Sequence, residues 1–188
     1  MVHGLIMIHP KRRLIIHNGF TMAELMITVA ILSILSAVGF ASFSRSYSDR
    51  QLRLAAIELA TVLAKTREIA TKDIAIDSSC TITQRVDSLT RVVSATLDPA
   101  DCIKTSLPSA NLQAISGNTN LEVDKTTAFT FFSGGLSSDD STPPVTDTTV
   151  RIRSSSASHQ WCVNVTLPAS IIRVGVDGGN GTCDYLRG

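Results

Sequence analysis

Gly19, Phe20 and Glu24 are the residues of this chain whose types and spacing indicate chemistry. If the Gly19–Phe20 peptide bond is cut, Phe20 gains a free amino group, and Glu24 lies four residues further on. A carboxylate at that position can pair with an amine, either that of its own chain or that of a neighbouring copy. Two simpler interpretations of Glu24 stay open: it lies shallow enough in a membrane to reach water, or it is a helix-start residue stabilised by the helix dipole.

The segment that must position these residues is strongly apolar. From Phe20 to Phe43 the only charged residue is Glu24, and this run exceeds the roughly 20 residues that cross a bilayer. The three basic residues 11–13 precede it, and the positive-inside rule keeps such residues in the cytoplasm. We therefore expect residues 20–43 to span the membrane, with the rest of the chain on the far side.

The start of the apolar segment resembles the class III signal of type IV prepilins and of type II secretion pseudopilins. The resemblance lies in Gly19-Phe20-Thr21-Met22-Ala23-Glu24-Leu25 and the apolar helix that follows. It implies that residues 1–19 are a leader, removed by a prepilin peptidase that cuts after Gly19 and methylates the amine of Phe20. It also implies that Glu24 recruits the subunit into a filament by neutralising the N-terminal amine of the adjacent subunit.

The sequence predicts an α+β fold with a long first helix. Past Phe43 apolar residues recur every three or four positions, which is typical of a helix that packs one face on a core. No proline occurs between Phe20 and Lys72, so one helix is expected to comprise a membrane half, residues 20–43, and an amphipathic half, residues 44–72. Residues 73–188 are expected to form a small head built on an antiparallel β-sheet.

Short strand-like runs fill the predicted head. The predicted strands cover residues 81–83, 89–93, 112–115, 128–132, 148–153, 161–165 and 171–176, and residues 133–147 are predicted to be an exposed loop. The order of the last four strands resembles that of the minor pilins and pseudopilins of the FimT, FimU and GspH group. This resemblance implies a minor pilin, with a GspH-like pseudopilin as the alternative.

Some DNA-uptake members of that group grip DNA with a basic cluster near the C-terminus. The candidate DNA contacts here are Arg151, Arg153, Arg173 and Arg187. The chain without its leader is slightly acidic, and phosphate contacts from basic residues supply most non-specific affinity for DNA. Nucleic acid is therefore a minor alternative partner.

The four cysteines all follow the predicted span and so lie on its oxidising side, where disulfides persist. Four cysteines allow three pairings. We favour Cys80–Cys102 and Cys162–Cys183, because each closes a local loop of about 20 residues, which contributes about 3 kcal/mol in the chain-entropy model. Free buried cysteines are the alternative.

No residue pattern predicts catalysis, a metal or a cofactor. His159, beside Ser158, is interpreted as a solvated turn residue, and Asp177–Gly181 lacks the ligand spacing of an EF-hand and is interpreted as a turn. The predicted function is a structural subunit of a type IV pilus. Its expected partners are other pilins, the prepilin peptidase, inner-membrane lipid and the assembly platform. The expected location is the bacterial inner membrane with a periplasmic head, and afterwards the cell surface.

Overall fold

The computed structural model describes residues 20–73, 80–100, 102–132, 135–137, 147–166, 171–179 and 181–185. The chain divides into two compact units, Met1–Phe40 and Ala41–Gly188. The first unit is described only from Phe20 and consists of the beginning of the first helix.

Helix α1 is a single α-helix from Met22 to Asp73, 52 residues long, as the absence of proline predicts. Its second half carries the apolar stripe that the sequence indicates. Leu52, Leu59 and Leu63 on this stripe are completely buried. The helix predicted over residues 20–72 and the observed helix, Met22–Asp73, differ only at their ends.

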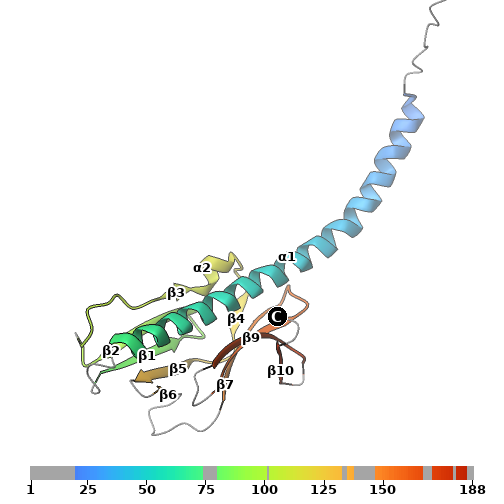
Figure 1. The fold of residues 1–188 in the computed structure, drawn as a ribbon. Coiled ribbons are helices and arrows are strands. Elements are labelled where there is room, and N and C mark those ends of the chain that lie inside the picture. The colour runs from blue at the N-terminus through green and yellow to red at the C-terminus, as the bar shows by residue number, and fades with distance from the viewer. Residues whose placement is uncertain are drawn as a thin grey trace, which may run out of the picture. The chain divides into compact units, whose positions relative to one another are not determined.

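Sheet A is a five-stranded antiparallel sheet in the order β3-β2-β1-β5-β6 (Figure 1). Its strands are β1 (Thr81–Val86), β2 (Val92–Asp98), β3 (Ala110–Asn111), β5 (Thr127–Phe132) and β6 (Gly135–Ser137). Burial alternates along β1, where Ile82, Gln84 and Val86 face the core, as a strand with one covered face requires.

Sheet B is a second five-stranded antiparallel sheet, in the order β10-β9-β8-β7-β4. Its strands are β4 (Leu121–Val123), β7 (Thr148–Ser154), β8 (Gln160–Thr166), β9 (Ile171–Asp177) and β10 (Cys183–Asp184). Strand β8 pairs along its whole length with β9 and is buried at five consecutive positions from Trp161 to Val165. Both of its faces are therefore covered.

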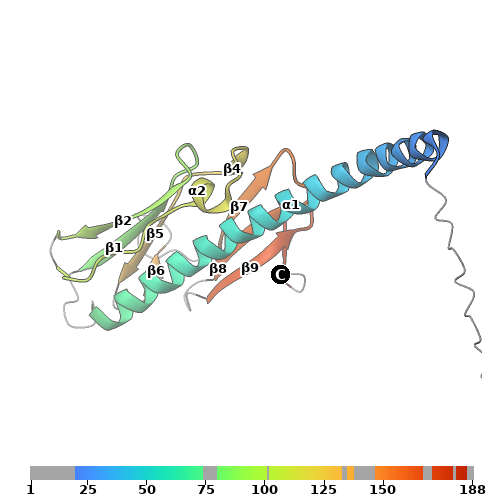
Figure 2. The ribbon, with the colours of Figure 1, turned by 90° about the horizontal axis from the view of Figure 1, so that it is seen from above.

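One apolar core joins the second half of α1 to both sheets. The buried cluster includes Leu59 of α1, Phe129 and Phe131 of sheet A, and Val150 and Val163 of sheet B. Figure 1 and Figure 2 show the later turns of α1 lying along the strands of the head. The α+β architecture predicted from the sequence is confirmed.

Three local predictions within the head are wrong. The predicted strand 112–115 is helix α2 (Leu112–Ser116), because Asn111 caps its start through a bond from the Ala114 amide and Gly117 ends it with φ +66°. The predicted strand 89–93 begins only at Val92, after a turn. The predicted loop 133–147 contains strand β6, and most of its other residues lie outside the described part of the chain.

Candidate functional site

The beginning of α1 is a reciprocal capping box formed by Thr21 and Glu24. Glu24 Oε2 accepts hydrogen bonds from the Thr21 amide and the Thr21 hydroxyl, each 2.9 Å long. In return, the Glu24 amide donates to Thr21 Oγ1 over 3.2 Å. A Thr-x-x-Glu box satisfies backbone N–H groups that have no partner within the helix, so it explains why the helix begins at Met22.

The capping box leaves Glu24 with a free acceptor. Only Oε2 is bonded within the described residues, whereas a carboxylate offers about four lone-pair sites on two oxygens. Phe20, the residue expected to carry the new amine, has 78% of its surface exposed. Gly19 lies outside the described residues. Helix capping and pairing with an amine are therefore compatible roles for one carboxylate.

The described apolar side chains of the first unit have no protein cover. Every large apolar residue from Phe20 to Phe40 whose exposure is described is more than half exposed, with Met22 at 79% and Phe40 at 76%. By length and composition, α1 contains one segment that is apolar enough to cross a membrane, with a mean hydropathy of 2.2. An apolar surface of this extent needs lipid or other protein against it.

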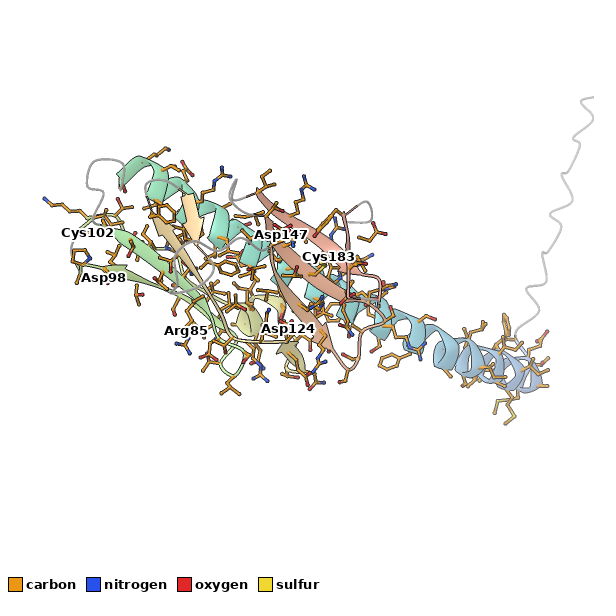
Figure 3. All side chains as sticks on the ribbon, turned by 90° about the horizontal axis from the view of Figure 1, so that it is seen from below. Arg85, Asp98, Cys102, Asp124, Asp147 and Cys183 are labelled. Atoms are coloured by element: carbon orange, nitrogen blue, oxygen red, sulfur yellow. A yellow bond between two sulfur atoms is a disulfide. The ribbon has the colours of Figure 1, made fainter. Side chains whose placement is uncertain are left out.

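Two disulfides join Cys80 to Cys102 and Cys162 to Cys183, the pairs that the sequence analysis favours. Figure 3 shows Cys102 and Cys183 far apart, so the two bonds tie different parts of the head. In the second bond, Cys162 of β8 is the cross-strand partner of Gly175 in β9, and Cys183 lies in β10 on the other side of β9. A Cβ atom on Gly175 would lie 2.9 Å from the backbone oxygen of Asp184, so glycine is needed for the C-terminal segment to lie over the strand.

Arg151 lies on the outer face of sheet B and is held by carboxylates. Its Nε donates to Asp177 Oδ2 over 2.9 Å, its Nη2 donates to the Gly181 carbonyl, and its Nη1 lies 3.6 Å from Asp124 Oδ2. The exposed fraction of the Asp177 side chain is only 6%. Two carboxylates thus balance the charge of Arg151, and its guanidinium anchors the β9–β10 turn to β7.

The other candidate DNA contacts are also engaged where they are described. Arg153 forms an exposed ion pair with Glu122 over 2.9 Å. The guanidinium carbon of Arg173 lies 5.8 Å from the centre of the Tyr185 ring, a cation–π contact. Arg187 lies outside the described residues. Sheet B therefore brings Arg151 and Arg153 together with matching acids, rather than forming an open basic patch.

Asp49 of α1 clamps the turn between β7 and β8. Its carboxylate accepts from the Ser158 amide over 3.0 Å, the Ser158 hydroxyl over 2.6 Å and the His159 amide over 3.2 Å. Burial raises the pKa of Asp49, but the hydrogen bonds from Ser158 and His159 outweigh it and hold the pKa below its ordinary value. The clamp joins residues 109 and 110 positions apart in the sequence.

The Asp49, Ser158 and His159 side chains do not have the geometry of a Ser-His-Asp triad. In a triad the serine and the aspartate contact opposite ring nitrogens of the histidine. Here Ser158 Oγ, at 2.9 Å, and Asp49 Oδ2, at 3.5 Å, both face His159 Nδ1. The Ser158 hydroxyl donates its proton to Asp49 and therefore not to His159. The cluster serves to hold the turn on the helix.

The segment after β9 forms a turn, as the sequence indicates. Gly179 has φ +83°, and its amide donates to Asp177 Oδ1 over 3.0 Å. A cavity of about 330 Å³ adjoins this turn and is lined in part by His159, Asp177 and Asp184. Within the described residues, no group of three or more histidine, cysteine, aspartate or glutamate side chains could hold a metal ion.

Two important residues, Thr21 and Asp49, were not predicted from the sequence. Thr21 could have been found, because a threonine three residues before a glutamate at the start of an apolar run is the signature of a capping box. Asp49 carried no such signal, because its partners become neighbours only when the head folds on the helix.

Comparison with known proteins finds a match for the N-terminal region. The prokaryotic N-terminal methylation motif matches residues 17–40. No curated protein and no solved structure matches the chain. The matched motif, together with a long first helix and a β-rich head, supports a type IV pilin-like protein. The motif is that of a type IV pilin-like precursor, and it implies processing by a prepilin peptidase and assembly with other pilins.

Proposed function

We propose that this chain is a minor type IV pilin, a non-enzymatic structural subunit that enters a pilus or its priming complex through α1. The peptidase cuts between Gly19 and Phe20 and methylates the new amine of Phe20. The remaining chain stays in the inner membrane with its head in the periplasm until the assembly platform transfers it to the filament. Glu24 then neutralises the N-terminal amine of the adjacent subunit.

The observation that carries this proposal is the exposed apolar surface within the matched motif, residues 17–40. Ile34 has 68% of its surface exposed and Leu35 has 62%, and their apolar neighbours are similarly bare. Since burying apolar surface yields about 25 cal/mol per Å², a helix of this kind is stable only when covered by lipid or by other helices. A pilin uses both covers in turn: first the membrane, then the neighbouring subunits of the filament.

The experiment that tests the proposal is mass spectrometry of sheared surface filaments and of membranes from the native cell. The expected peptide begins at N-methyl-Phe20 and is present in the sheared fraction. A strain without the prepilin peptidase is the control, and its peptides should extend upstream of Phe20.

The fraction in which the peptide is found distinguishes a pilus subunit from a secretion pseudopilin. The methylated peptide among sheared filaments supports a pilus subunit. The same peptide confined to membranes overturns the pilus assignment in favour of the alternative, a GspH-like pseudopilin of a type II secretion system. Recovery of only the uncleaved leader in wild-type cells contradicts both assignments.

A further inference from the structure

Residues 43–50, which we call the interfacial segment, carry exposed aromatic and basic side chains on one short stretch of helix. Phe43 and Tyr47 stack on each other with ring centres 6.3 Å apart. They remain 69% and 55% exposed, respectively. Arg45 and Arg50 are exposed beside them. Within the part of the head that the structure describes, no residue buries these four side chains.

The two arginines of the interfacial segment lack partners among the described residues. No ion pair or hydrogen bond links Arg45 or Arg50 to another described side chain. The one acid in the segment, Asp49, points its carboxylate at Ser158 and His159. Two positive charges are therefore available to an outside partner.

The position of the segment along the chain indicates which partner this is. Between Glu24 and Arg45 lie 20 residues without a charged side chain. At 1.5 Å per residue they form about 30 Å of helix, which equals the thickness of the hydrocarbon core of a bilayer. When Glu24 lies at one surface of the hydrocarbon, Arg45 therefore reaches the other surface.

Phosphate headgroups fit the side chains at that level. Tyrosine and other aromatic rings concentrate at membrane–water interfaces, where one part of the ring is apolar and its surroundings are wet. Arginine extends an apolar stem along the lipid and places its guanidinium among the phosphates, which it binds in a bidentate manner. Basic residues next to a span attract anionic lipid surfaces.

We propose that the interfacial segment binds the headgroups of anionic phospholipids at the membrane surface on the side of the head. Arg45 and Arg50 pair with lipid phosphates, while Phe43 and Tyr47 lie among the upper acyl chains and glycerol groups. This contact fixes the depth of α1 in the bilayer before assembly. The inference rests on the membrane insertion that is part of the proposed function.

The test uses the full chain reconstituted into vesicles of equal parts phosphatidylcholine and phosphatidylglycerol. Protein is released in mild detergent, and the lipids that remain bound are counted by native mass spectrometry. We expect phosphatidylglycerol to be enriched over phosphatidylcholine. The double substitution Arg45→Gln/Arg50→Gln should lower this enrichment by about threefold or more.

A matched control removes two basic residues from the far end of the same helix. Lys65→Gln/Arg67→Gln changes the net charge equally and should leave the enrichment unchanged. The basic residues 11–13 of the leader also attract anionic lipid, so the comparison is made between variants that share them. Replacing chloride by inorganic phosphate at equal ionic strength should not change the enrichment, since the proposed ligand is a lipid headgroup and not a free anion.

Three results would overturn the inference. These are equal retention of both lipids by the wild-type chain, enrichment that persists in Arg45→Gln/Arg50→Gln, and an equal loss in the Lys65→Gln/Arg67→Gln control. If the double variant keeps its lipid but is lost from filaments, the arginines contact a neighbouring subunit instead. Resistance to carbonate extraction is measured in parallel, because failure there contradicts membrane insertion itself.

Discussion

At the scale of single residues, Glu24 combines two roles, and a substitution to alanine would remove both at once. Its Oε2 caps the start of α1 through Thr21, and its charge is available for an amine. Glutamine preserves the first role, because its side-chain oxygen also completes a capping box, but it removes the charge. Thr21→Ala does the opposite, since it removes the hydroxyl and leaves the carboxylate intact.

We predict that Glu24→Gln is processed and methylated normally but is lost from filaments. Its amount in sheared filaments should fall by about tenfold or more, because an ammonium buried without its counter-charge costs several kcal/mol, about 3–5. Thr21→Ala should cost about 1 kcal/mol of helix stability and still assemble. Quantitative mass spectrometry of the N-methyl-Phe20 peptide in both fractions provides the measurement.

Thr21→Ser is the matched control, because it keeps the hydroxyl that closes the capping box. It should behave as the wild type in both fractions. If Thr21→Ala fails to assemble while Glu24→Gln assembles, helix capping and not charge is what the filament requires of this pair.

At the scale of elements, the Asp49 clamp joins α1 to the hairpin of β7 and β8. The carboxylate takes two backbone amides and a hydroxyl from the turn. Next to it, Arg53 of α1 lies over the Trp161 ring at 5.7 Å. The clamp therefore determines where the start of β8 rests on the helix, beyond what apolar packing alone would specify.

We predict that Asp49→Asn lowers the free energy of unfolding at pH 7 by about 1.5–3 kcal/mol, the usual range for hydrogen bonds to a charged group. The folded pKa of Asp49 lies below its unfolded value. Its contribution is therefore present at pH above the unfolded value and is lost as the pH falls through the folded pKa. The stability difference between wild type and variant should shrink toward pH 3.

Trp161 is the single tryptophan of the chain and lies at the clamp, so its fluorescence can follow unfolding of the full chain in detergent. Glu58→Gln on the same helix is the control, because no hydrogen bond from a described residue reaches that carboxylate. It should change stability little at any pH. A pH-independent gap between wild type and Asp49→Asn would show that the substitution acts through packing rather than through the charge.

At the scale of the whole molecule, charge pairing decides what the outer face of sheet B can bind. Arg151 meets Asp124 and Asp177, and Arg153 meets Glu122. Because non-specific affinity for DNA comes from cations that neutralise phosphates, a face whose cations are already paired with acids offers little affinity for DNA. Two of the four candidate DNA contacts, Arg151 and Arg153, are thus paired with acids of the head.

We predict no mobility shift of double-stranded DNA by the full chain at physiological salt. The paired variant Glu122→Gln/Asp124→Asn removes two acids from the face and should produce weak binding that disappears as salt is raised. Electrophoretic mobility at several salt concentrations is the measurement. Tight, salt-dependent binding by the wild-type chain that is lost in Arg173→Gln would instead support a DNA-uptake pilin.

The long helix, the β-rich head and several strands could be predicted because their signals are local. The long helix is indicated by an apolar run without proline, and strand β7 by the alternation of residues 148–153. Each signal lies in the same residues that form the element. Helix α2 was mistaken for a strand because Leu112–Ile115 is short and apolar, and its caps, Asn111 and Gly117, decide its conformation. An element this short has too few residues for periodicity to distinguish a helix from a strand.

The sequence by itself determined the methylation motif, the apolar segment and the α+β class, since each is carried by residues that are neighbours along the chain. Only the tertiary structure decided the partners of Asp49, Arg151 and Gly175, because these contacts join positions that are distant in sequence. Their energies depend on which groups a fold brings within hydrogen-bonding or van der Waals distance. A local sequence pattern does not indicate which distant residues become neighbours when the sheets pack on α1.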